Sequence, residues 1–249
     1  MTNDYEDEIE RMKIMSLNIE QYQDNWKARK SRIIEAIMKE SPDVLFLQEV
    51  SDDRRHQVKD GLHQGAQLNS KLRYRTLIYD IMEQRRSEKG VEINSQVFDG
   101  LACLTNLQVV FHRVMRLKKE REDRHYRGVQ IVKVIYNGKE VLFYNVHYSN
   151  ASKWSYLHFN ETKRYWNSKK ALPILVGDLN ILNPKTVTRM AGRQFESSYD
   201  FKNYVSFPSK GEVPDYILIP RQLYSFKSVR CGYDNCSDHR ALIAEIKIK

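Results

Sequence analysis

Short apolar runs recur along this chain, and several of them border polar side chains. The run 172–176 has the length and composition of a buried strand, and Gly177 allows a tight turn just before Asp178 and Asn180. Similar runs lead into or out of further polar positions: Asn18, Gln48, Glu49, Asn145, His147, Asp215, Asp238 and His239. The pattern predicts a sheet that presents catalytic groups at its edge. Carboxylates near an imidazole suit hard-metal binding and proton transfer at a phosphate.

Apolar periodicity also predicts helices, over 26–39, 52–62 and 154–169, with a short one after residues 183–184. The apolar face of the first is formed by Ile33, Ile34, Ile37 and Met38. Ser41-Pro42-Asp43 ends it, and Ser51 or Asp52 is expected to cap the second.

Strands are expected over 12–17, 44–49, 101–110, 129–136, 139–146, 172–176, 204–207, 215–219, 226–230 and 242–248. Asn137-Gly138 is a strong signal for a hairpin between two of them. The stretch 75–100 is harder to assign, and we expect a strand there followed by a polar loop over 83–94. Apolar strands with helices on the outside predict an α/β fold of two packed sheets flanked by helices.

Length and composition agree with one domain over 12–249, preceded by an acidic, disordered tail over 1–11. No apolar run is long enough to span a membrane, and the acidic start is unlike a signal peptide, so a cytoplasmic monomer without a membrane partner is expected. Cys103 lies in an apolar run and is expected to be buried. A disulfide between Cys231 and Cys236 is geometrically possible, but reduced thiols are favoured.

A net charge of +9 favours polyanionic partners. Part of this charge is clustered, at Lys27, Arg29, Lys30 and Arg32, and at Arg113, Arg116, Lys118, Lys119, Arg121, Arg124 and Arg127. Each cluster alone is also compatible with a solvated face.

The ordered set of strand-end motifs resembles the endonuclease/exonuclease/phosphatase family, which includes deoxyribonuclease I. The resemblance extends over about the whole chain, from Met12 to the last strand. It implies a four-layered sandwich, two mixed β-sheets flanked by helices, and a phosphodiesterase that depends on Mg²⁺ or Mn²⁺. Glu49 would be the principal metal ligand, with Asn18 and Asp238 holding or supporting the cation directly or through water.

The resemblance also assigns the catalytic residues. Asp178 and Asn180 would orient the attacking water and bind the phosphate, and Asp215 would hydrogen-bond the catalytic His239. Either Asp178 or the Asp215–His239 pair could take the proton from water. His239 could instead stay charged and stabilise the transition state.

Four further positions resemble branches of the family. His147 would be a general acid that protonates the leaving oxygen, with Asp99 as its carboxylate partner. Arg127 and Asn150 would bind substrate phosphate. The remaining histidines are expected at the surface: His56, His63, His112, His125 and His158.

The motif around Asn18 and the residues before Asp215 depart from the abasic-site enzymes. We therefore expect a DNA endonuclease that uses in-line attack by a metal-activated water. A phosphomonoesterase or a lipid or inositol phosphoesterase of the same fold is the alternative, and a catalytically silent binding module is the least favoured interpretation.

Overall fold

A computed structural model describes residues 11–56, 62–88 and 91–249. Two six-stranded sheets form its centre. The strands of the first are β1 (Arg11–Asn18), β2 (Val44–Asp53), β3 (Thr76–Glu88), β4 (Val91–Thr105), β11 (Tyr224–Gly232) and β12 (Ala241–Ile248). Those of the second are β5 (Gln108–Arg116), β6 (Gly128–Tyr136), β7 (Lys139–His147), β8 (Ile174–Asp178), β9 (Phe195–Ser197) and β10 (Asp215–Pro220). The spatial orders are β11-β12-β1-β2-β4-β3 and β5-β6-β7-β8-β10-β9.

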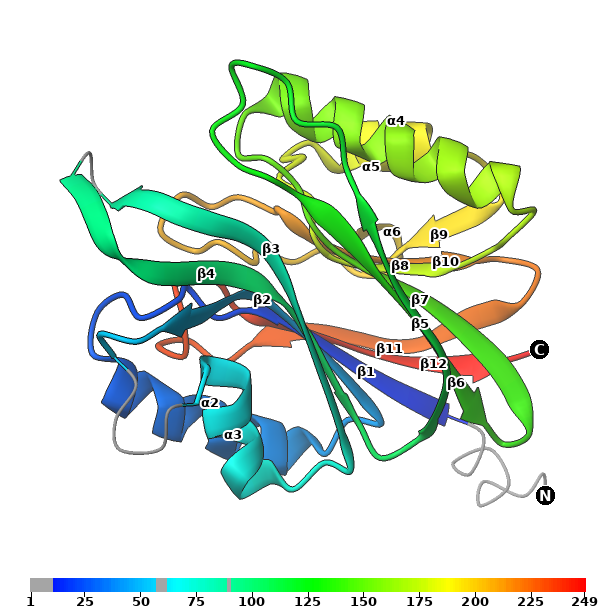
Figure 1. Ribbon diagram of the computed structural model, residues 1–249. Coiled ribbons are helices and arrows are strands. Elements are labelled where there is room, and N and C mark those ends of the chain that lie inside the picture. Colours follow the sequence, from blue (N-terminus) through cyan, green and yellow to red (C-terminus); the bar gives the residue numbers. More distant parts are fainter. Residues whose placement is uncertain (1–10, 57–61, 89–90) are drawn as a thin grey trace.

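Helices cover the outer face of each sheet, which gives four layers (Figure 1). The helices α2 (Trp26–Glu40) and α3 (Gln64–Leu72) lie on the first sheet. The second sheet is covered by α4 (Ser152–Ser168) and α5 (Pro184–Ala191), with the short α6 (Ser198–Phe201) beside them. The predicted sandwich of two mixed sheets flanked by helices is confirmed.

The inner faces of the two sheets share one apolar core. Alternate residues of each strand point into it, and Phe46 of β2 packs on Phe143 of β7 with ring centroids 5.1 Å apart. A buried polar chain also crosses between the sheets: the Gln48 amide donates to Asn145 at 2.8 Å, and Asn145 donates to Gln130 at 3.0 Å. These amides satisfy one another, and therefore tie the sheets together directly below the strand ends.

Several local predictions are confirmed. The helix predicted over 26–39 is α2, capped by Asn25, and α4 and α5 lie where helices were expected. Asn137 and Gly138 both have positive φ and join β6 to β7, as a two-residue hairpin requires. Cys103 is buried, and all three cysteines are free thiols.

No helix in the described residues is long and apolar enough to cross a bilayer.

Other local predictions are wrong. Residues 52–53 continue β2 and 54–56 form a turn, so the helix expected over 52–62 is absent from the part of that range that is described, and α3 follows it instead. Residues 83–88 and 91–94 belong to the long strands β3 and β4 and form no loop. The strand expected over 101–110 is broken by a turn at 106–107, and 204–207 forms only an isolated bridge at Phe207.

Three single residues also differ from expectation. Met38, expected on the apolar face of α2, is 64% exposed. Arg11, assigned to the N-terminal tail, begins β1, and the rest of that tail lies outside the described residues. His158, expected at the surface, is buried, with its Nε2 3.7 Å from Asp123 Oδ2.

Candidate active site

Two parallel strand pairs define the site, one in each sheet. β1 pairs with β2 and places Asn18 opposite Gln48, while β7 pairs with β8 and places His147 opposite Asp178. The antiparallel strand β10 adds Asp215 opposite Asp178. Because parallel strands end at the same edge of a sheet, side chains that are far apart in the sequence meet here.

Gly177 makes the approach of β7 and β8 possible. Its φ is +129°, and a Cβ at this position would lie 2.1 Å from the carbonyl oxygen of Val146. Any larger residue would push the two strands apart just before Asp178.

A β-bulge directs Glu49 into the site. Between β2 and β4 the register shifts, with Leu47 opposite Ala102 and Val50 opposite Gly100, so that β2 contains one extra residue. Glu49 has a φ of 53°, in the left-handed region. The bulge thus turns the Glu49 carboxylate to the edge of the sheet.

Asn18 joins a carboxylate of the first sheet to a carboxylate of the second. Its buried amide nitrogen donates to Glu49 Oε1 at 3.2 Å and to Asp178 Oδ2 at 3.1 Å. Its amide oxygen accepts the backbone N–H of Glu20 at 3.0 Å. Asn18 therefore orients Glu49 and Asp178 in this structure.

His239 and Asp215 form a buried pair. His239 Nδ1 lies 2.8 Å from Asp215 Oδ2, and Nε2 lies 3.8 Å from Asp178 Oδ2. Burial lowers the pKa of His239, but the charge and hydrogen bond of Asp215 outweigh it and raise that pKa to about 10. The imidazole is therefore charged at neutral pH.

Asp178 is held on both oxygens. Oδ1 accepts the backbone N–H of Asn180 at 2.9 Å, and Oδ2 accepts Asn18. Burial, followed by the charge of Asp215, raises the pKa of Asp178 to about 7. A carboxyl with a pKa near neutrality is suited to exchange a proton with substrate or water.

Arg127 is buried behind the site and holds two of its residues. Nη1 donates to His147 Nδ1 at 3.0 Å, and Nη2 donates to Asn150 Oδ1 at 3.1 Å. Burial, then the charge of Arg127, lowers the pKa of His147 well below its ordinary value. The expected partner of His147, Asp99, has no hydrogen bond to it among the described residues.

Asp99 lies near Glu49 and Arg127 but is not fully paired. Its Oδ1 and the Nε of Arg127 are both buried without a hydrogen-bond partner in the described part of the chain. Burial and the charge of Glu49 raise the pKa of Asp99 to about 7. The positive charge of Arg127 acts on Asp99 in the opposite direction and lowers that pKa, but burial outweighs it.

The predicted residues surround a cleft of about 230 Å³. Its walls include Glu49, His147, Asn150, Asp178, Asn180, Asp238 and His239. Asn18, Asp99, Arg127 and Asp215 are buried and do not line this cleft. The structure therefore brings all the predicted site residues to one region, where one group lines the cleft and the other is buried next to it.

Sequence reasoning missed Lys210 and Glu20. Lys210 lines the cleft from a turn, and its Nζ lies 5.3 Å from the centroid of the Phe207 ring. Glu20 accepts the backbone N–H of Asp238 at 3.3 Å. The turn signal from Pro208 to Gly211 marked the first position, but no local pattern singled out the second.

The donor set fits a hard divalent cation. Glu49 and Asp238 both present carboxylates to the cleft. Glu20 lies beside Asp238, and burial, then the charge of Asp238, raises the pKa of Glu20. Carboxylate oxygen ligands suit Mg²⁺ or Mn²⁺. Asp178, Asp215 and His239 could also place ligand atoms within 4.8 Å of one another, but Asp215 already accepts a hydrogen bond from His239, and Asp178 accepts hydrogen bonds from Asn18 and Asn180.

The sequence profile of the endonuclease/exonuclease/phosphatase family matches residues 15–239. This chain belongs to that family. A search of curated proteins by sequence gives no match. Members of the family are generally phosphoester hydrolases that use divalent metals.

Solved structures of family proteins share the fold. One from Beutenbergia cavernae is 18% identical, with a TM-score of 0.74 over 96% of this chain and 72% of that chain. Another from Leptotrichia buccalis is 17% identical, with a TM-score of 0.74 over 96% and 99% of the two chains. The human Nocturnin catalytic domain is 18% identical, with a TM-score of 0.71 over 96% and 95%.

Proposed function

We propose that this family member is a divalent-metal-dependent phosphodiesterase that hydrolyses nucleic acid, as a DNA endonuclease. The observation that carries the proposal is the charged His239–Asp215 pair directed at Asp178, beside the carboxylates of Glu49 and Asp238. A bound cation would be held by Glu49 and Asp238, and would neutralise charge on the phosphate and make water more acidic.

The residues of the chain divide the remaining work. Asp178 is the group we assign as the base that takes a proton from the attacking water, since its pKa lies near neutrality. His239, charged and held by Asp215, would stabilise the negative charge that develops on the phosphoryl oxygens. Asn180 and Asn150, which line the cleft, would hydrogen-bond the phosphate.

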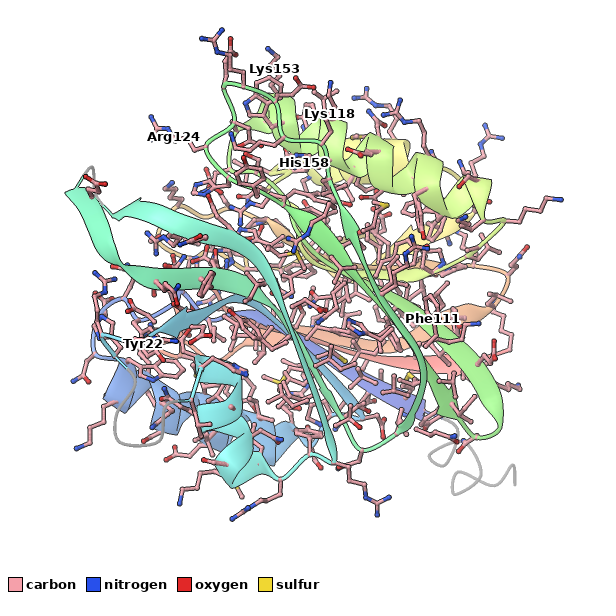
Figure 2. The ribbon with its side chains drawn as sticks, in the orientation of Figure 1. Tyr22, Phe111, Lys118, Arg124, Lys153 and His158 are labelled. Atoms are coloured by element: carbon pink, nitrogen blue, oxygen red, sulfur yellow. The ribbon has the colours of Figure 1, made fainter. Side chains whose placement is uncertain are left out.

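The preference for nucleic acid rests on charge. The net charge is +9, and the basic loop, defined as residues 117–127 between β5 and β6, lies next to the cleft through Arg127. Lys118 and Arg124 of the basic loop lie on the same side of the molecule as α4, which carries Lys153 (Figure 2). Lys118 is 74% exposed in its side chain, and its pairing with Glu120 at 2.8 Å is a surface contact that a phosphate could replace.

A substrate panel tests this proposal. Hydrolysis with Mg²⁺ would be measured on plasmid DNA, single-stranded DNA, RNA, bis-p-nitrophenyl phosphate and inositol phosphates. Nicking of circular plasmid supports the endonuclease, whereas activity confined to inositol phosphates or monoesters supports the alternative of a small-substrate phosphoesterase. Absence of hydrolysis on every substrate of the panel would support the interpretation of the protein as a catalytically silent binding module.

The basic loop gives an independent test. Replacing Lys118, Lys119, Arg121 and Arg124 with Ser should raise the KM for DNA and reduce the salt slope, by up to about one unit for each phosphate that is no longer bound. The matched control removes four exposed lysines elsewhere, at Lys39, Lys169, Lys202 and Lys227. An equal effect of both variants would mean that only net charge matters, and no effect of either would remove the loop from DNA binding.

A further inference from the structure

A second cavity adjoins the catalytic cleft. It has a volume of about 420 Å³ and is lined by residues 122–125 of the basic loop and by Ser149, Asn150, Ala151 and Trp154. Asn150 lines both this cavity and the cleft that contains His147 and Asp178. A substrate whose phosphate contacts Asn150 can therefore extend a neighbouring group into the second cavity.

The walls of this cavity are fixed by buried hydrogen bonds. Asp123 Oδ1 accepts the Ser149 hydroxyl at 2.7 Å and the backbone N–H of His125 at 3.2 Å. Its other oxygen lies 3.7 Å from Nε2 of the buried His158, whose Nδ1 accepts the backbone N–H of Ser149 at 3.3 Å. These contacts pin the basic loop against the start of α4, so the cavity exists before any ligand binds.

The lining combines an aromatic ring with cations. Trp154 is partly exposed, and the ammonium group of Lys153 lies 4.4 Å from its ring centroid. Arg124 also lines the cavity and is exposed. On the same basic loop, Lys119 lies 5.1 Å from the ring of Tyr126, which is 56% exposed. Aromatic rings interleaved with cations are what proteins use to bind unpaired nucleobases and the backbone between them.

Two acidic residues restrict the class of ligand that the cavity can bind. Glu122 and Asp123 both line it, and Glu122 lies 3.9 Å from Lys153. A phosphate inside would be repelled by these carboxylates, whereas an uncharged planar base would not. The volume is in the range of pockets for one small ligand, about 300–1,000 Å³, and is far too small for a base-paired duplex.

We propose that this cavity binds the unpaired nucleobase next to the scissile phosphate, with the base stacked on Trp154. The inference rests on the proposed nucleic-acid phosphodiesterase function and refines its substrate to strands whose base is unpaired at that position. DNA and RNA offer the same planar base, so both are included in the test.

The experiment compares single-stranded oligonucleotides with one defined scissile linkage, protected elsewhere by phosphorothioates. The base on the 5′ or the 3′ side of that linkage is present or replaced by an abasic residue. Removing the base on one of the two sides should reduce the kcat/KM of the wild-type protein by about 5- to 150-fold relative to the strand that keeps both bases. This is the range expected for the loss of one stacked base. Trp154→Ala should abolish that preference while leaving cleavage of the abasic strand unchanged, and Trp154→Phe should restore it.

Tyr156→Ala is the matched control, because Tyr156 is an exposed aromatic residue of the same helix that does not line the cavity. It should keep the wild-type preference. The inference is overturned if the wild-type protein cleaves base-containing and abasic strands equally, or if Trp154→Ala keeps the preference or slows both strands alike. Nicking of circular plasmid without cleavage of any single-stranded oligonucleotide would overturn this inference and leave the proposed function standing. Absence of hydrolysis of both plasmid and oligonucleotides would overturn the proposed function, and this inference with it. Parallel DNA and RNA strands show which sugar the neighbouring cleft accepts.

Discussion

Arg127 donates a hydrogen bond from Nη1 to Nδ1 of His147 at 3.0 Å. A guanidinium has no acceptor, so Nδ1 must be unprotonated and the ring proton must be on Nε2. That nitrogen lies 3.6 Å from Asp178 Oδ2 and 3.8 Å from Glu49 Oε1. Arg127, expected to contact substrate phosphate, thus fixes the tautomer of a histidine in this structure.

This relationship changes the expected role of His147. A general acid needs a protonated imidazole, but burial and Arg127 lower the pKa of His147 well below its ordinary value. We expect a neutral ring that donates from Nε2, so His147→Ala should slow an alkyl phosphodiester and a nitrophenyl phosphodiester by similar factors. A decrease confined to the alkyl ester, whose leaving group needs a proton, would restore the general-acid role.

Replacing Arg127 should expose its positioning role. Arg127→Met removes the donor to Nδ1. We expect kcat to fall by about 10- to 150-fold, as for removal of one charged hydrogen bond of about 1.5–3 kcal/mol, with little change in KM. The ¹⁵N NMR signals of His147 should show Nδ1 unprotonated in the wild-type protein and a mixed tautomer in the variant. If Arg127→Met instead raised KM and left the ¹⁵N signals of His147 unchanged, Arg127 would be assigned to phosphate binding.

Glu49→Gln keeps the shape of the side chain and removes its charge. Hydrolysis in Mg²⁺ should fall by about three orders of magnitude, since the charge stabilisation by a bound cation is worth several kcal/mol. The increase in Tm on adding Mg²⁺ should also disappear. Glu245→Gln, on the distant strand β12, is the control and should retain both responses. Near wild-type turnover by Glu49→Gln would refute its assignment as a metal ligand.

Asp215→Asn should lower the pKa of His239. The charge and hydrogen bond of Asp215 are the strongest of the effects that hold this pKa at about 10 against burial, so removing them should bring it down, while the charges of Asp178 and Asp238 still raise it. We expect kcat to fall by about 10²–10⁴-fold at pH 7 on any diester. An NMR titration of His239 provides the pKa. Asp200→Asn, an exposed carboxylate on α6, should behave as wild type.

Asp99 makes the metal-free protein less stable as the pH rises. Its pKa is 3.8 in the unfolded chain and about 7 in the folded protein, because of burial and Glu49. Between these values the folded state binds more protons than the unfolded state, so the free energy of unfolding falls with increasing pH.

Asp99→Asn removes this penalty. In EDTA the variant should gain stability over wild type between about pH 4 and pH 7, by up to a few kcal/mol at pH 8, with no comparable gain at pH 4. Urea unfolding at both pH values gives the difference. An equal effect at pH 4 and pH 8 would show that Asp99 is ionised in the folded protein at both.

The sequence, together with the family resemblance of its motifs, predicted the fold and most residues of the cleft, because these residues lie in or next to short apolar runs that can be recognised locally. Asp178 ends β8, and Asp215 begins β10. The contacts of Arg127 and the burial of His158 could not be predicted in this way. The burial of His158 depends on the basic loop folding back onto α4. The contacts of Arg127 to His147 and Asn150 join residues 20 or more positions apart.

The wrong elements have similar physical causes. β3 and much of β4 are rich in charged and polar residues, yet they form long strands because they pair with each other by backbone hydrogen bonds at the end of the sheet. The polar run after Glu49 resembled a helix start, but it continues β2 in a new register across from β4. Pairing across a sheet overrides such local preferences.

The bulge in β2 has a consequence for how function could be gained or lost in this architecture. Before it, Val44 and Phe46 face the other sheet and Leu45 and Leu47 face the helices; after it, Val50 faces the helices although its number is even. Removing one residue between Leu47 and Val50 would restore uninterrupted alternation and remove the bulge that turns the Glu49 carboxylate toward the cleft. The position of the Glu49 carboxylate therefore depends on the number of residues in β2 as much as on the identity of the side chain. Deletion of a single codon could remove this carboxylate from the cleft while both sheets still form.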